Sequence, residues 1–110
     1  MPRPLVLGNG RLHVAIDHGL CIRDLYWPYV GLHNHLSGNR GRVGLWVDGT
    51  FAWLADPAWQ RSLRYVENAL TTDVTLEHPG LRSRLRINDC VLRDFDILMR
   101  RIRVENLDER

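Results

Sequence analysis

The sequence predicts an all-β protein built as an antiparallel β-sandwich. Short runs in which apolar and polar residues alternate recur along the chain, and pairs of Gly, Asn, Asp and Pro separate them. The 3.6-residue periodicity of an amphipathic helix is nearly absent. A chain of 110 residues has the size of one domain, so we expect one sandwich domain or part of one.

The first third of the chain predicts a hairpin and one further strand. The pair Asn9-Gly10 favours positive φ angles, so we expect a tight turn after the run Leu5 to Leu7. In the strand that follows, successive side chains point to opposite faces. Its faces are Leu12, Val14 and Ile16 on one side, and Arg11, His13, Ala15 and Asp17 on the other. A third run, residues 20–26, stops before Pro28, whose nitrogen has no hydrogen to donate to a sheet.

The middle of the chain predicts a long surface loop and a second hairpin. Residues 31–41 contain three glycines and two asparagines with few apolar groups, a composition typical of loops. The runs 42–47 and 50–54 are rich in β-prone residues, and Asp48-Gly49 between them favours a type I′ turn. Residues 55–60 are then expected to be a connection, because Asp56-Pro57 favours a turn.

The remaining chain predicts further antiparallel strands. Residues 63–65 and 70–78 carry β-prone side chains, and Pro79-Gly80 predicts the turn after them. Beyond this turn a regular alternation follows. It places Leu81, Ser83, Leu85 and Ile87 on one face and Arg82, Arg84, Arg86 and Asn88 on the other. The last run, residues 97–104, reaches almost to the end, so we expect the chain to hold only the first portion of a sandwich.

Charge and composition argue against several classes of function. The net charge is only +2, and all 15 basic residues are Arg, so long-range attraction for nucleic acid or an acidic membrane is weak. We expect the arginine face of residues 82–86 to be solvated and paired with acids across the sheet. No apolar run is long enough for a secretory signal or a membrane span, so we expect a cytoplasmic protein without nucleic-acid or membrane partners.

The cysteines and histidines do not predict a metal site. Cys21 and Cys90 match no metal or redox spacing, so we expect both to be free thiols that behave as small buried apolar residues. His33 and His35 are two ligands where a metal site normally needs three or four. We therefore expect no metal and no other cofactor.

Several motifs, in the same order along the chain, resemble the N-terminal domain of prokaryotic glucoamylases and glucodextranases, the family-fifteen glycoside hydrolases. The most specific is the run from Asp24 to Gly31 (DLYWPYVG), which is followed closely by Asn34-His35. The resemblance extends over nearly all of the chain. Its other parts are residues 7–10 (LGNG), 22–23 (IR), 42–49 (RVGLWVDG) and 100–106 (RRIRVEN).

The resemblance implies a large antiparallel supersandwich of the galactose-mutarotase-like kind. In that family a separate helical toroid carries two catalytic glutamates, and the whole enzyme is an inverting exo-hydrolase of α-glucosidic bonds. The implied partner of this chain is such a helical catalytic domain, and the chain alone is expected to be non-catalytic. Its own glutamates match none of the family's catalytic positions and are expected to be surface charges: Glu67, Glu77, Glu105 and Glu109.

The best candidate site is the aromatic cluster and the loop after it, which would form a substrate rim or a domain interface. Flat aromatic faces stack on the C–H faces of sugars, but aromatic residues are equally common at protein contacts, so both readings stay open. The aromatic residues are Tyr26, Trp27 and Tyr29, and the loop adds Asn34 and His35 as hydrogen-bonding groups. Asp24 is expected to fix this loop through an ion pair with Arg23 or a neighbour.

Other aromatic residues and the strand edges leave alternatives. We expect Trp46 and Trp53 to pack against the sheet, whereas Trp59 fits either packing or binding. Two further functions fit the same β pattern: an independent sugar-binding module and a protein-interaction domain. Exposed strand edges without lysine also predict self-association.

Overall fold

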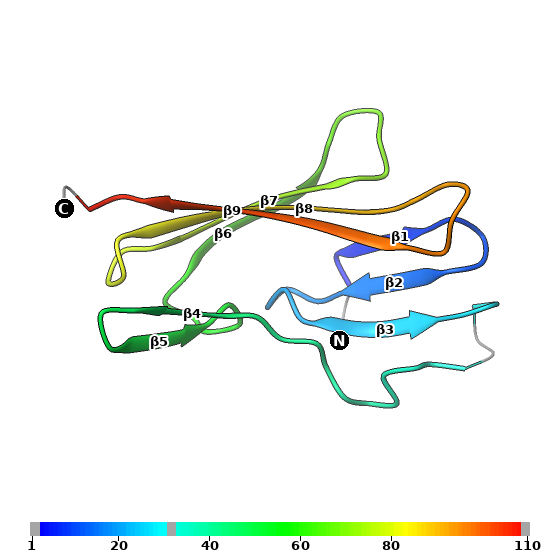
Figure 1. The fold of residues 1–110 in the computed structure, drawn as a ribbon, viewed down its shortest axis with the longest axis horizontal. Helices are drawn as coiled ribbons and strands as arrows, with labels where there is room; N and C mark the ends of the chain where they lie inside the picture. Colours follow the sequence, from blue (N-terminus) through cyan, green and yellow to red (C-terminus); the bar gives the residue numbers. More distant parts are fainter. Residues whose placement is uncertain (1–2, 31–32, 109–110) are drawn as a thin grey trace.

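The computed structural model describes residues 3–30 and 33–108, and these residues form β-strands and no helix (Figure 1). The antiparallel all-β class predicted from the sequence is therefore confirmed. No helix long and apolar enough to span a bilayer occurs in this part of the chain. The strands are β1 (Leu5–Gly8), β2 (His13–Ile16), β3 (Ile22–Tyr26), β4 (Gly44–Val47), β5 (Thr50–Trp53), β6 (Gln60–Tyr65), β7 (Thr72–His78), β8 (Ser83–Val91) and β9 (Leu98–Asn106).

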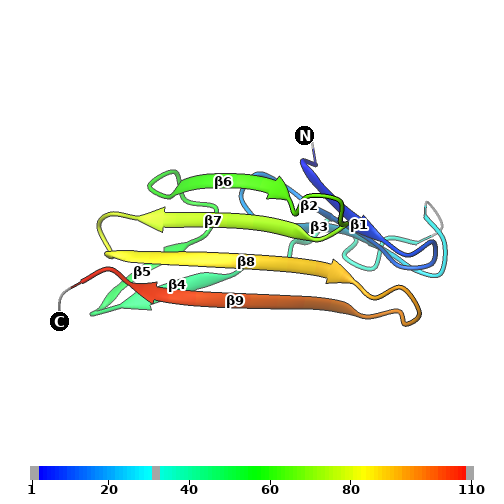
Figure 2. The same ribbon diagram turned by 90° about the horizontal axis from the view of Figure 1, so that it is seen from above.

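The strands form two layers of a sandwich. One layer is a four-stranded sheet in the order β6-β7-β8-β9. The other layer consists of two smaller sheets, β1-β2-β3 and β4-β5, which lie next to each other beneath the larger sheet (Figures 1 and 2). The sheet β1–β3 therefore lies beneath one end of the larger sheet, and the β4–β5 hairpin lies beneath the other end.

The hydrophobic core lies between these layers. Strands β7 and β8 place every second side chain inward, so the alternation predicted for residues 81–88 is confirmed. Trp59 is buried in this core and its indole N–H donates to the carbonyl of Trp53 at 2.9 Å, which decides its role as packing. The buried apolar side chains include Leu5, Val14, Ile16, Ala52, Leu54, Val74, Leu76, Leu85 and Ile87.

The turns follow local sequence chemistry in one hairpin and depart from it in another. Asp48 and Gly49 have φ angles of 48° and 82°, so the type I′ turn of the β4–β5 hairpin is confirmed. The β1–β2 connection is wider than the expected tight turn, since it spans residues 9–12. The Asn9 side chain explains the difference, because its Oδ1 accepts hydrogen bonds from the backbone N–H groups of Arg11 and Leu12.

One expectation about burial is wrong. Trp46 was expected to pack against the sheet but is 68% exposed. It lies on the outer face of the β4–β5 ribbon, which no other layer covers among the described residues, while Trp53 on that face contacts Phe51 and Arg42.

Both cysteines are free thiols as expected, but only one of them is fully buried. Cys21 is buried, whereas Cys90 is half-buried. Burial is the main reason that the pKa of the Cys21 thiol lies above its ordinary value, and the nearby Asp17 carboxylate raises it further. The thiol form of Cys21 is thereby favoured, as suits a packing residue.

Candidate functional site

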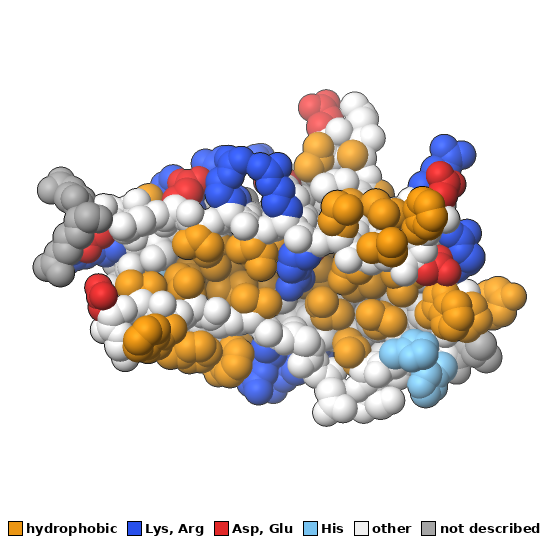
Figure 3. All heavy atoms as spheres, in the orientation of Figure 1, with side chains coloured by type: hydrophobic (Ala, Val, Ile, Leu, Met, Phe, Trp, Pro, Cys, Tyr) orange, Lys and Arg blue, Asp and Glu red, His pale blue; other side chains and the backbone are white. Residues whose placement is uncertain are grey.

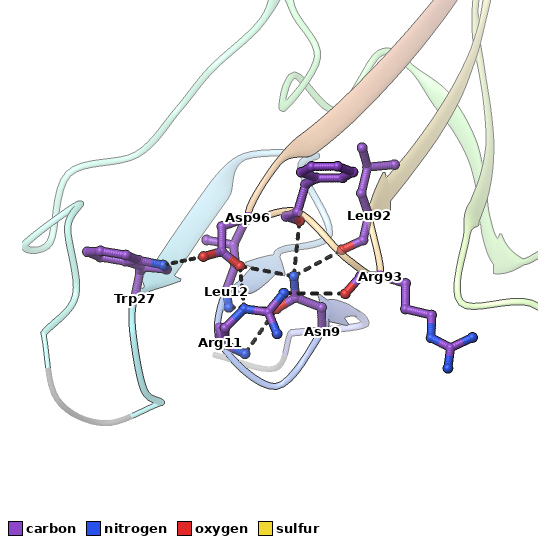
Figure 4. A network of polar contacts seen from close by, with 8 residues as sticks. Asn9, Arg11, Leu12, Trp27, Leu92, Arg93 and Asp96 are labelled. Carbon is purple, nitrogen blue, oxygen red and sulfur yellow. Dashed lines mark hydrogen bonds and ion pairs between the residues drawn. The ribbon is translucent and has the colours of Figure 1, made fainter.

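The site begins with Trp27, which follows the last residue of β3. Its indole Nε1–H donates a hydrogen bond of 2.8 Å to Oδ2 of Asp96 (Figure 4). Asp96 lies in the connection between β8 and β9, so this bond joins the two layers of the sandwich. The indole ring is fixed in this way while 45% of the residue stays exposed to solvent.

The hairpin loop between β1 and β2 supplies the other partners of Asp96. Arg11 Nε donates to Asp96 Oδ1 at 2.8 Å, and Asn9 Nδ2 donates to the same oxygen at 3.2 Å. The Asn9 amide also reaches the carbonyl oxygens of Leu92 and Phe95, at 3.0 and 3.1 Å (Figure 4). Loops from the two layers are therefore tied together around one carboxylate.

These donors determine the protonation of Asp96. Its pKa lies below the ordinary value, chiefly because Trp27 donates a hydrogen bond to the ionised form, with further hydrogen bonds from Arg11 and Asn9. Partial desolvation raises the pKa of Asp96, but its effect is smaller than the combined effect of these hydrogen bonds. Asp96 is thus an ionised acceptor at neutral pH, and it holds the Trp27 indole in one orientation.

A surface pocket of about 460 Å³ lies beside this indole. Three leucines from different segments form its apolar lining: Leu12, Leu25 and Leu98. Trp27, His35 and Asp96 provide the rest of the lining. The His35 ring Nε2 lies 3.1 Å from the backbone oxygen of Trp27. An apolar floor next to a fixed aromatic ring and polar groups is typical of small-ligand sites.

Asn34 braces the loop rather than facing the pocket. Its Oδ1 accepts from the backbone N–H groups of Leu25 and Leu36, both at 3.1 Å, and its Nδ2 donates to Asp24 at 3.0 Å. The other oxygen of Asp24 pairs with Arg3 at 2.9 Å. Asp24 therefore fixes this loop as expected, but its ion pair is with Arg3, while Arg23 lies 3.6 Å from Asp17 instead.

The remaining candidate residues lie apart from the pocket. Tyr26 lies within β3, where its ring is 5.8 Å from the ring of His13 on the adjacent strand. Tyr29 is 65% exposed and is not among the lining residues. The structure therefore brings together Trp27 and His35, uses Asn34 as a brace, and places Tyr26 and Tyr29 elsewhere.

Asn9, Arg11 and Asp96 were not identified from the sequence. Asn9 was read only as a turn residue, and nothing local distinguishes Asp96 from other loop aspartates. Their contacts join residues that are far apart in the chain: Arg11 and Asp96 are separated by 85 residues, and Asn9 and Asp96 by 87. The sequence gives one further signal at this hairpin. Residues 7–10, which include Asn9-Gly10, are one of the motifs that resemble the glycosidase family.

The arginine face of β8 is paired with acids across the sheet. Arg84 lies 3.1 Å from Glu105 and 3.6 Å from Glu77, and Arg86 lies 3.0 Å from Glu105, so the pairing expected for the arginine face is confirmed. Glu109 lies outside the described residues. His33 and His35 meet edge to face, but residues 3–30 and 33–108 hold no group of three metal-ligating side chains.

The carboxyl groups at the pocket can be compared with those that glycoside hydrolysis requires. Inverting glycoside hydrolysis needs two carboxyl groups, one of them kept protonated by a raised pKa. Among the described residues the pocket lining includes one carboxyl group, that of Asp96, whose pKa is lowered. Scans against family models, curated proteins and solved structures found no match to this chain.

Proposed function

We propose that this chain is a non-catalytic β-sandwich domain of a glucoamylase-like glycoside hydrolase acting on α-glucosides. In this role it packs against a helical catalytic domain and offers Trp27 as a sugar-contacting surface. The observation that carries the proposal is the combination, in Trp27, of an indole anchored to Asp96 and a ring that is 45% exposed.

The geometry of the pocket supports sugar contact. A pyranose has an apolar C–H face, which suits both an aromatic ring and the leucine lining, and hydroxyl groups, which suit the His35 and Asp96 atoms beside them. Because Asp96 already fixes the indole, little further side-chain entropy is lost when a ligand binds. A rigid aromatic surface of this kind favours weak, reversible binding of glucosides.

Exposed apolar side chains next to this surface support packing against another domain. Tyr29 and Val30 follow Trp27 directly and are 65% and 61% exposed. Single exposed apolar residues are normal, whereas a contiguous group at a loop marks an interaction surface. The same observation favours the second candidate function, a protein-interaction domain that makes no contact with sugar.

Titration calorimetry with maltose and isomaltose separates these functions. The sugar-rim function predicts a Kd of about 1 mM or tighter, equivalent to a binding free energy of about −4 kcal/mol, and its loss in Trp27→Ala. Trp46→Ala is the matched control, because Trp46 is exposed but lies far along the chain on β4. Absence of binding by the unmodified chain, or equal loss in both variants, would leave the protein-interaction function.

Packing against a helical domain has its own test. We expect the chain to co-elute with the isolated helical catalytic domain of a glucoamylase-like enzyme, and the double variant Tyr29→Ser/Val30→Ser to elute separately. An independent sugar-binding module would bind sugar equally well and never co-elute. In either case we expect no release of glucose from maltose by the chain alone.

A further inference from the structure

Strand β9 is an open edge of the larger sheet. It pairs with β8 over nine consecutive positions from Leu98 to Asn106, and no described strand pairs with its other side. Natural edges are usually protected by a proline, a bulge, a lysine, an inward-pointing charge or a short length. The segment 98–106 has no proline or lysine, and its register with β8 is unbroken. Its one inward-pointing charge, Arg100, is paired with Asp89 within the sheet. From Leu98 to Glu105, the outer side of β9 therefore presents backbone N–H and C=O groups to which no described strand is paired.

The inward face of β9 carries two incompletely covered apolar side chains beside Arg100, which is paired with the buried Asp89 at 2.7 Å. Ile102 and Val104 lie opposite Ile87 and Leu85, which are fully buried, yet they are themselves 40% and 59% exposed. A cleft of about 740 Å³ runs between this part of β9 and the β4–β5 hairpin. Figure 3 shows a band of hydrophobic side chains along the gap between the layers. The apolar lining residues of the cleft include Leu45, Val47, Leu81 and Val104.

The outward face of β9 carries positive charge without matching acids. Arg101 and Arg103 lie on this face, opposite Asn88 and Arg86 of β8. Both are exposed, and no described carboxylate pairs with either of them. Arg86 and Arg84 already share Glu105. A positively charged strip therefore runs beside the free edge.

We propose that the β9 edge is a docking site for an extended strand of another polypeptide in which acidic and apolar residues alternate. The backbone of that strand pairs with β9, as in other cases of strand addition. Because side chains alternate between faces, its carboxylates meet Arg101 and Arg103 while its apolar residues pack beside Ile102 and enter the cleft at Val104. This site is separate from the pocket at Trp27 and goes beyond the proposed function.

Charge also argues against a second copy of the chain as the occupant. An antiparallel pair of β9 strands centred on Ile102 places Arg101 opposite Arg103, and like charges directly opposite each other are destabilising. The only acid on β9 is Glu105, which is already paired with two arginines. The self-association expected from the sequence is therefore an alternative outcome of the test.

The test uses fluorescence anisotropy with synthetic nine-residue peptides that are blocked at both ends. One peptide alternates glutamate and valine, a second alternates lysine and valine, and a third has the composition of the first in a non-alternating order. We expect the first peptide to bind the full chain at least tenfold more tightly than the other two. We also expect that preference to weaken at high salt, which screens exposed charges.

Charge reversal identifies the edge. The double variant Arg101→Glu/Arg103→Glu alters exposed side chains only, and we expect it to prefer the lysine peptide. Arg64→Glu is the matched control, because Arg64 is exposed on β6, at the opposite edge of the same sheet, and this variant should keep the original preference. Trp27→Ala should also keep it, which separates this result from any failure of sugar binding.

Three results would overturn the proposal. Equal binding of the non-alternating peptide would show general charge attraction, and an unchanged preference in the double variant would place the peptide elsewhere. A chain that sediments as a dimer and binds none of the peptides would show that a second copy occupies the edge. Thermal unfolding of each variant verifies that it is folded before binding is measured.

Discussion

The two ends of the sandwich are closed in different ways. At the end formed by β1–β3, polar side chains of the Asn9 loop reach across to the β8–β9 loop and bind its carbonyl and carboxylate oxygens. At the end formed by β4–β5, a cleft separates the hairpin from β9, and both apolar and polar side chains line it. The first end therefore holds a rigid surface at Trp27, whereas the second leaves an edge and a cleft for another polypeptide.

Two isoleucines on neighbouring strands differ in how far they are covered. Ile87 and Ile102 are directly opposite each other in β8 and β9, and their side chains share one face of the sheet. Ile87 is fully buried, but Ile102 is 40% exposed. The hydrophobic pattern alone does not separate them, because burial depends on what covers each position.

The largest expected effect concerns this isoleucine pair. Ile87→Ala should lower the free energy of unfolding by about 2–5 kcal/mol, since it removes buried methyl groups and leaves a cavity. Ile102→Ala should cost less than about 1 kcal/mol, because its side chain is already partly in water. Urea denaturation measures both. Equal losses would show that β9 is covered as fully as β8.

A smaller effect is expected at the tied end. Asn9→Ala removes the amide that binds the part-buried carbonyl of Leu92 and the exposed carbonyl of Phe95, and should cost about 1 kcal/mol through the lost hydrogen bonds. Asn39→Ala, at an exposed loop position, should cost less than about 0.5 kcal/mol. Thermal unfolding compares the two variants. Similar melting temperatures for both would contradict the conclusion that the Asn9 side chain links the two layers.

The smallest effect is the pH dependence of that tie. Because the pKa of Asp96 is lowered by Trp27, Arg11 and Asn9, its contribution to stability is present above the ordinary carboxyl pKa of about 3.9 and is lost as pH falls through the lower folded value. Asp96→Asn should therefore melt at a lower temperature than the unmodified chain at pH 7. This difference should vanish at acidic pH, and a difference independent of pH would contradict the charge-based account.

Much of the fold follows from local sequence, whereas most of the site does not. The alternation of residues 81–88 and the Asp48-Gly49 pair specify a strand and a turn by local chemistry, and both are confirmed. Trp27 and His35 were identified because aromatic and polar residues cluster there. Asp96 was missed because its partner Trp27 lies 69 residues away, and the exposure of Trp46 likewise depends on tertiary neighbours.

The most direct test of sugar contact follows the indole N–H signals in a two-dimensional NMR titration with maltose. The chain has four tryptophans, so Trp46, Trp53 and Trp59 serve as internal controls for Trp27. The account predicts that the Trp27 signal shifts with saturation while the other three stay in place. A Trp27 signal that does not move, or shifts confined to Trp46 and Trp53, would contradict it.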